Sequence, residues 1–357
     1  MPRHPRPPPD DDQAETEYAR LRASVRRPDA VPSDALMSLF EAHPHHGGMR
    51  LDRFLAEVMS RLTRTRAHLI VTDWAFTPEG RPLRPSHRIR PGERVVVYRP
   101  LWEEPEIERD IVVVYEDAAL LGVNKPPGLP VHPTARVYRN TLTTLLGERY
   151  PNEHAALCHR IDKETSGLII VARTLDAERT MKVAFAARAV KKTYLALVYG
   201  EVRDDAFEVD AAMALEGGEV GVKMCVRSEA QGGQAARTTV RVVERLDGFT
   251  LVSAHPETGR QHQIRVHLAH AGHPLVGDKL YAHGDAVFLR CLEGPLDDEL
   301  RARLLLERQA LHAHAASFAH PVTGESVTLT APMPSDMAEF CAQRRRPSTG
   351  PMPGGSA

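Results

Sequence analysis

The 357-residue sequence lacks the features of several common protein classes. Its four cysteines, Cys158, Cys225, Cys291 and Cys341, lie far apart and form no CxxC pair. That spacing argues against a disulfide framework or a zinc knuckle and predicts a reducing, cytoplasmic location. No run of residues approaches the roughly 18 apolar positions of a membrane span. The first residues, MPRHPRPPPDDD, contain no apolar export segment, so we expect neither export nor a membrane partner.

An excess of one charge is also missing overall, because the formal net charge is only −1. The arginines are nevertheless unevenly distributed. Residues 49–99 contain eleven arginines against five acidic residues, a local excess of six positive charges. Such asymmetry is typical of segments that contact nucleic acid, although a solvated arginine-rich surface would give the same count. Charge alone leaves both interpretations open.

Changes in composition divide the chain into four parts. Residues 1–47 are rich in proline, aspartate and arginine and predict a disordered or loosely attached leader, with one helical stretch near residues 35–42. Residues 48–100 predict a small basic module with an amphipathic helix from residue 51, a short helix through residues 68–71 and a β-branched strand near residues 95–98. Residues 105–340 form the third part, and residues 341–357 predict a flexible tail.

The third part consists of short β-rich runs separated by turns and a few helices. Strands are predicted at residues 112–115, 120–123, 168–172, 194–199, 238–243 and 250–253, and a helix at residues 177–189. The elements alternate irregularly, without a repeating βαβ unit. This pattern predicts a mixed α+β domain with a largely antiparallel sheet.

The stretch CHRIDKETSGLIIVART, residues 158–174, places polar side chains directly before an apolar run. The run predicts a central strand, so Asp162 lies on the loop that enters it, where a rigid scaffold aims side chains. A lone aspartate at such a place more often caps a turn. The catalytic loop of a protein kinase reads His-Arg-Asp, whereas here Ile161 stands between the arginine and the aspartate. An aspartic protease would have Thr or Ser and then Gly directly after the aspartate, so both classes are excluded.

The segment HRIDKETSGL (159–168) resembles the signature loop of the RluA-type RNA pseudouridine synthases. Other segments follow in that family's order: LGVNKPPGLPVHP (121–133), KKTYLALVYG (191–200), ETGRQHQIRVHLAHAGHPLVGDKLY (257–281) and LHAHAASFAHPVTGE (311–325). The resemblance spans about residues 110–334. Residues 48–100 also resemble the small RNA-binding module of the fourth protein of the ribosomal small subunit, with WAFTPEGRPLRP in place of its usual Val-x-Val-Asn-Gly hairpin.

The resemblance implies an isomerase that detaches uracil from its ribose, turns it and rejoins it through carbon 5, without a cofactor. The uridine must first be flipped out of the folded RNA. Asp162 is then the catalytic carboxylate, beside the positive charge that develops at the ribose carbon. Arg265, on a helix predicted within residues 259–272, is implied as its charge partner, because a buried carboxylate needs a cation to stay ionised.

The same resemblance places the ring of Tyr194 against the flipped base, with its hydroxyl available for proton transfer. Ile264 is implied as the apolar floor of the pocket. Three residues are implied as further substrate contacts, chiefly to phosphate: His159, Arg160 and Lys125. The histidines at positions 262, 267, 270 and 273 have no H-E-x-x-H arrangement, so we expect no metal ion.

We expect a monomeric enzyme whose partner is RNA. Large-subunit ribosomal RNA is the expected substrate, and transfer RNA is the alternative. A second alternative is a catalytically silent RNA-binding assembly factor that retains the fold. Such a protein would have no chemical reason to keep Asp162, Tyr194 and Arg265 together. The sequence therefore favours the enzyme.

Overall fold

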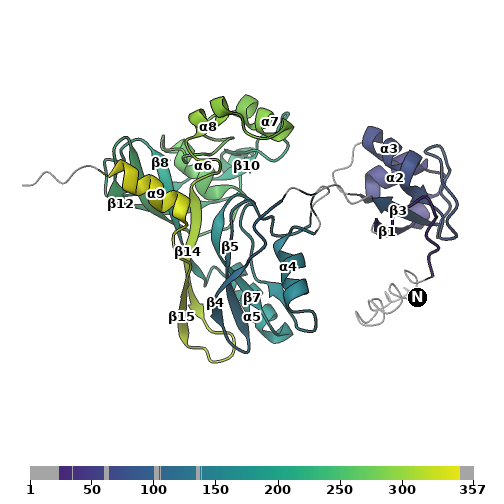
Figure 1. Cartoon of the computed structure of the whole chain (residues 1–357), viewed down its shortest axis with the longest axis horizontal. Coiled ribbons are helices and arrows are strands. Elements are labelled where there is room, and N and C mark those ends of the chain that lie inside the picture. The colour runs from purple at the N-terminus through teal and green to yellow at the C-terminus, as the bar shows by residue number, and fades with distance from the viewer. Residues whose placement is uncertain are drawn as a thin grey trace, which may run out of the picture. The chain divides into compact units, whose positions relative to one another are not determined.

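The computed structural model describes residues 24–33, 35–59, 64–99, 104, 106–133, 137 and 139–345. The chain divides into two compact units, Met1–Glu103 and Glu104–Ala357 (Figure 1). Among the helices of the described residues, none combines the length and the apolar character that crossing a membrane requires.

The first unit is a small sheet covered by two helices. Its elements are β1 (Leu36–Glu41), the 3-10 helix η1 (Pro44–His46), α2 (Leu51–Val58), α3 (Arg64–Trp74), β2 (Ala75–Phe76) and β3 (Arg94–Arg99). The strands pair antiparallel in the order β1–β3–β2. Phe54 of α2, Val71 of α3 and Val97 of β3 belong to one buried core, so the two predicted helices do pack on the predicted strand.

Two predictions for this unit are wrong. The helix expected near residues 35–42 is strand β1, because pairing with all six residues of β3 overrides the helical propensity of its Leu and Met. The leader is not loose where it is described, since Val31 and Ala35 are buried with Tyr98 in a second small core. Residues 1–23 of the predicted leader lie outside the described residues.

The second unit is built on a ten-stranded sheet with the order β4–β5–β7–β14–β8–β13–β12–β9, with β6 beside β7 and β15 beside β14. The strands are β4 (Val112–Glu116), β5 (Leu120–Lys125), β6 (Ala156–Leu157), β7 (Ser166–Ala172), β8 (Lys191–Tyr199), β9 (Ala206–Asp210), β12 (Arg237–Arg245), β13 (Phe249–Pro256), β14 (Leu311–Ala319) and β15 (Ser326–Thr330). A separate hairpin pairs β10 (Met213–Leu215) with β11 (Met224–Val226). Among the described pairings only β7 with β14 is parallel, so the predicted mixed, largely antiparallel sheet is confirmed.

The described residues of this unit also contain seven helical elements, of which the first two pack on opposite faces of β7. They are α4 (Leu142–Arg149), α5 (Leu175–Ala186), α6 (Gln263–His270), α7 (Asp285–Glu293), α8 (Asp298–Leu304), α9 (Ser335–Arg344) and the 3-10 helix η2 (Glu229–Gln231). The tail predicted from residue 341 begins too early, because Cys341 of α9 is buried against Leu197 and Phe249. Residues 346–357 lie outside the described residues.

Strand β7 is buried on both of its faces. Leu168 and Ile170 pack with Met181 of α5, whereas Ile169 and Val171 pack with the side chains of α4. A strand covered on both faces needs apolar residues at every position rather than at alternate ones. This burial explains the continuous run LIIVA and gives the loop before β7 a rigid support.

The contact between β7 and β14 depends on one glycine. Gly167 has a φ of +110°, and a Cβ built on it would lie 2.3 Å from the carbonyl oxygen of Ala313. Gly167 and Ala313 are register partners in the parallel pairing of the two strands. Only glycine permits this approach, which joins the β4–β5–β7 half of the sheet to the β8–β13–β12 half.

We expect Gly167→Ala to lower the free energy of unfolding by about 3 kcal/mol or more, because the new methyl group overlaps the backbone of β14. Urea unfolding followed by far-ultraviolet circular dichroism measures the loss. Tryptophan fluorescence is unsuitable, since both tryptophans, Trp74 and Trp102, belong to the first unit.

Gly147→Ala in α4 is the matched control, with no atom within 4 Å of its added Cβ. It should add about 0.5–1 kcal/mol. Equal effects of the two changes would contradict this account of the strand contact.

Candidate active site

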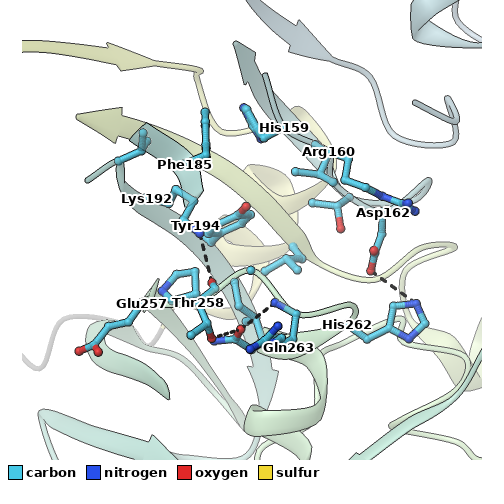
Figure 2. Close-up of a pocket in the computed structure, with 18 of the residues that line it drawn as sticks. His159, Arg160, Asp162, Phe185, Lys192, Tyr194, Glu257, Thr258, His262 and Gln263 are labelled. Atoms are coloured by element: carbon cyan, nitrogen blue, oxygen red, sulfur yellow. Dashed lines mark hydrogen bonds and ion pairs between the residues drawn. The ribbon is translucent and has the colours of Figure 1, made fainter. Parts of the chain in front are cut away.

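A cavity of about 600 Å³ lies where three segments meet: the loop before β7, the turn from α5 into β8, and the loop that leads into α6 (Figure 2). Its volume is in the usual range for sites that bind small molecules. Six of the seven predicted site residues line it: His159, Arg160, Asp162, Tyr194, Ile264 and Arg265. Residues more than 100 positions apart in sequence thus share one pocket.

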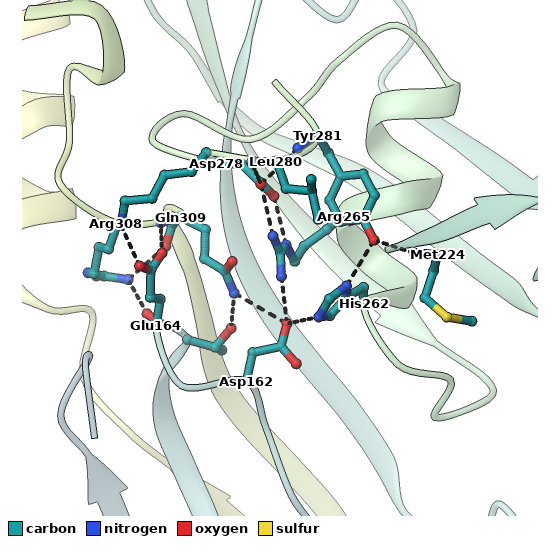
Figure 3. A network of polar contacts seen from close by, with 12 residues as sticks. Asp162, Glu164, Met224, His262, Arg265, Asp278, Leu280, Tyr281, Arg308 and Gln309 are labelled. Carbon is teal, nitrogen blue, oxygen red and sulfur yellow. Dashed lines mark hydrogen bonds and ion pairs between the residues drawn. The ribbon is translucent and has the colours of Figure 1, made fainter. Parts of the chain in front are cut away.

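The Asp162 carboxylate is held through one of its two oxygens (Figure 3). Nη1 of Arg265 donates to Oδ2 at 3.2 Å, and Nε2 of Gln309 donates to the same oxygen at 3.4 Å. Nε2 of His262 lies 3.9 Å from Oδ2. All three contacts are to Oδ2, and no described residue forms a hydrogen bond to Oδ1. That oxygen is therefore the one available to a molecule in the pocket.

Arg265 is itself anchored by a second carboxylate. Its Nε donates to Oδ2 of Asp278 at 2.7 Å and its Nη2 to Oδ1 at 2.9 Å. Burial opposes both charges, but their mutual attraction outweighs it, raising the pKa of Arg265 and lowering the pKa of Asp278. The backbone N–H groups of Leu280 and Tyr281 also donate to Asp278. This bidentate pair sets the guanidinium so that only Nη1 faces Asp162.

Lys125, predicted as a phosphate contact, does not fit that role. Its side chain is fully buried, and its ammonium group donates to the carbonyl oxygens of Pro126, Leu129 and Lys163 at 2.8–3.0 Å. Burial chiefly, and then the charge of Arg308, lower the pKa of Lys125 to about 7. All three N–H groups are used within the protein, so none remains for a phosphate. Lys125 instead ties the loop that carries Asp162 to the end of β5.

Tyr194 lies in β8, opposite Ala254 of β13 and Ala313 of β14, and is half-buried at the pocket. Burial raises the pKa of its hydroxyl, and the negative charge of Asp162 raises it further. The phenol therefore stays protonated near neutral pH and can donate a hydrogen bond, whereas it is a poor base. This state suits the predicted contact between the ring and a base better than proton removal by Tyr194.

The other predicted pocket residues differ in burial and in their contacts. Nε2 of His159 accepts the backbone N–H of Ile170 at 3.0 Å, and its ring stacks on Phe185 at 4.8 Å. Burial lowers the pKa of His159 to about 3, with a further contribution from Lys192. Ile264 is buried in the core under α6, as an apolar floor residue would be. Arg160 is exposed at the pocket.

His262 completes the polar network, and a hydrogen-bond chain defines its tautomer. The backbone N–H of Met224 donates to Oη of Tyr281 at 2.9 Å, and Oη lies 2.8 Å from Nδ1 of His262. Because Nε2 faces the carboxylate of Asp162, an acceptor, we assign the ring proton to Nε2 and let the hydroxyl donate to Nδ1. Burial chiefly, and then the charge of Arg265, lower the pKa of His262 to about 4. The imidazole is therefore neutral near pH 7.

Sequence reasoning missed four residues of this network: His262, Asp278, Tyr281 and Gln309. Asp278 carried a weak signal, because it lies close to the apolar Val276 and Leu280 in a segment already singled out, although Lys279 stands beside it. A charged residue in such surroundings needs a buried partner. Gln309 had no comparable signal, since its contact to Asp162 joins residues 147 positions apart.

One group with metal-ligand chemistry occurs among the described residues, and it lies outside the pocket. His45, His46 and Glu57 of the first unit place their ligand atoms within 4.8 Å of one another. Nδ1 of His46, however, accepts the backbone N–H of His43 at 2.9 Å. The neutral ring then carries its proton on Nε2, the nitrogen that faces Glu57 at 3.6 Å. A metal ion would have to displace that proton.

A carboxylate held beside a buried guanidinium, in a pocket of a mixed sheet, is the arrangement implied by the motifs of the RNA pseudouridine synthases. The family model described as RNA pseudouridylate synthase matches residues 119–270. The chain belongs to the RNA pseudouridine synthase family, whose members are isomerases that modify RNA.

Curated relatives agree with this assignment over most of the chain. The ribosomal large subunit pseudouridine synthase D of Xanthomonas campestris pv. campestris is 37% identical over 308 residues, covering 84% of this chain and 90% of that protein. Its counterpart in Pseudomonas aeruginosa is 34% identical over 315 residues, covering 85% and 94%. The solved structure of human RNA pseudouridylate synthase domain containing 1 is 28% identical and has a TM-score of 0.51, covering 64% of this chain and 86% of that one. The family match does not include the first unit.

We expect Asp278→Asn to lower the free energy of unfolding by about 3–5 kcal/mol, because it leaves the buried guanidinium of Arg265 without its bidentate partner. Urea unfolding followed by circular dichroism measures this loss. Asp176→Asn is the control, since that carboxylate is exposed on α5 and faces only Arg179 at 3.8 Å. Unchanged stability of the Asp278 variant would show that Arg265 does not depend on Asp278.

Proposed function

We propose that this protein converts uridine to pseudouridine in large-subunit ribosomal RNA and that Asp162 acts at the bond between sugar and base. The observation that carries the proposal is the asymmetry of the Asp162 carboxylate. Oδ2 is occupied by Arg265 and Gln309, whereas no described residue bonds to Oδ1 in the pocket. A carboxylate oxygen so placed can meet the positive charge that forms when a glycosidic bond breaks.

The proposed reaction needs no cofactor, because it is an isomerisation. The bond between N1 of uracil and C1′ of ribose breaks, uracil turns within the pocket, and C5 bonds to C1′. C5 then loses its hydrogen as a proton, and N1 gains one. Tyr194 would support the turning base with its ring and donate a hydrogen bond as a neutral phenol. Ile264 would form the apolar floor.

The choice of ribosomal RNA rests on the relatives, since both bacterial proteins named above are described as acting on the ribosomal large subunit. Transfer RNA is the alternative substrate to be tested beside it. A catalytically silent assembly factor is disfavoured because Asp162, Tyr194 and Arg265 line one pocket. We further propose a cytoplasmic, monomeric enzyme, consistent with four well-separated free cysteines.

We expect Asp162→Asn to lower pseudouridine formation by about 1,000-fold or more. RNA affinity should stay within about tenfold, roughly 1.4 kcal/mol, because phosphate contacts rather than this carboxylate hold the RNA. Tritium release from unmodified large-subunit rRNA transcribed with uridine labelled at carbon 5 measures the reaction under single-turnover conditions. The same assay on transfer RNA separates the two substrate classes. Clear turnover by the variant would remove Asp162 from the mechanism.

We also propose that the first unit binds RNA through its backbone phosphates. Three of its arginines, Arg81, Arg84 and Arg90, are exposed and form no ion pair with a carboxylate in the described part of the chain. They lie on the segment between β2 and β3, which belongs to the region with six excess positive charges. Exposed guanidinium groups without acidic partners are suited to phosphate oxygens.

The double change Arg81→Gln with Arg84→Gln should lower the log–log salt slope of RNA binding by about 2 units, because each lost phosphate contact removes roughly 0.9. Filter binding to unmodified large-subunit rRNA between 50 and 200 mM KCl gives the slope. The control is Arg290→Gln with Arg301→Gln. It removes one arginine from α7 and one from α8, each of which pairs with an acidic residue. Equal slopes for the two double variants would contradict an RNA-binding role of the first unit.

A further inference from the structure

Three arginines at the pocket form no ion pair with a carboxylate among the described residues: Arg160, Arg188 and Arg260, of which Arg260 donates to the carbonyl oxygen of Ala235. Arg160 and Arg188 both line the cavity and are exposed. In the part of the chain that the structure describes, neither guanidinium forms an ion pair with a carboxylate. Arg265, in contrast, contacts two carboxylates inside the same pocket. The positive charge of Arg160 and Arg188 is therefore available to an anion from outside the protein.

The backbone at Arg188 is an unusual place for an arginine. Its φ is +59°, directly after the end of α5. The N–H of Arg188 donates to the carbonyl oxygen of Phe185, and the N–H of Ala189 donates to that of Ala184. These two bonds define a Schellman motif, in which the residue at positive φ is usually glycine because a side chain there is strained. The stability of the turn does not explain an arginine at this position.

Lys192 lies four residues further along, at the start of β8, and also faces the pocket (Figure 2). Its ammonium group is partly buried and donates to the carbonyl oxygen of Thr258 at 3.1 Å. Thr258 is its only hydrogen-bond acceptor among the described residues, so two N–H groups remain. Burial lowers the pKa of Lys192. An anion in the pocket would favour the charged form and accept those two donors.

We propose that Arg188 and Lys192 form a subsite for a phosphodiester group of the RNA backbone next to the flipped uridine. The inference rests on the proposed function, because a nucleotide turned out of its stack has a phosphate on either side. Arg160 can meet one of them, and Arg188 with Lys192 can meet the other. In Figure 2, Lys192 and Arg160 lie on different sides of Tyr194, as contacts to two successive phosphates require. Arginine at the strained position is then kept for binding at the expense of stability.

The decisive variant is Arg188→Gly, for which the proposal expects opposite effects on binding and stability. The log–log salt slope of binding to unmodified large-subunit rRNA should fall by about 1 unit, since one phosphate contact is lost. The melting temperature should rise by roughly 2 °C, since glycine relieves the strained turn. Arg188→Lys retains the charge and should retain the slope. Lys192→Gln should lower the slope by about the same amount as Arg188→Gly.

Arg179→Gln provides the matched control. It removes one arginine from α5, the helix that ends just before Arg188. The guanidinium of Arg179 is exposed, faces Asp176 and does not line the pocket. Its salt slope should equal that of the wild type. An unchanged slope for Arg188→Gly, or an equal fall for Arg179→Gln, would overturn the subsite. Absence of tritium release by the wild-type protein from both rRNA and transfer RNA would overturn the proposed function instead, and the slopes would still decide whether Arg188 contacts phosphate.

Discussion

The buried guanidinium of Arg265 is the charge on which the arrangement of the site depends. It carries one positive charge between two carboxylates, and its bidentate pairing with Asp278 leaves a single N–H group for Asp162. Removing either partner of such a pair from a buried position leaves an uncompensated charge. The position of each of the three groups therefore depends on the other two. The arrangement also explains why one oxygen of Asp162 is occupied and the other is available to the pocket.

The sheet makes this charge arrangement possible. Asp162 precedes β7, Tyr194 lies in β8 and Arg265 lies on α6, and the three elements meet around β14. The close approach of β7 and β14 at Gly167 sets the distance between the two halves of the sheet. The burial of β7 on both faces then gives the Asp162 loop a packed support. Rigid strands thus position a polar site that the loops alone could not hold.

Local patterns carried most of what could be predicted. The continuous run of β7, the helix within residues 259–272 and the ordered motifs all depend on neighbouring residues, and the structure has a buried strand at β7 and a helix at α6 where they were predicted. The helix expected near residues 35–42 failed because the pairing of β1 with β3 involves residues more than 50 positions apart. Lys125 failed for a related reason, since one of its three carbonyl partners, Lys163, becomes its neighbour only when the loop around Lys163 folds back on β5.

The sequence by itself determined the family, the mixed sheet and the residues that share the pocket, because motifs and periodicity are properties of short segments. Only the tertiary structure decided how those residues are held. Gln309 reaches Asp162 through a contact that no local spacing encodes, and the tautomer of His262 follows from Tyr281 and Asp162, which come from other parts of the chain. The physical reason is that a buried charge is stabilised by whatever groups surround it in space, and those groups are assembled only when the sheet closes.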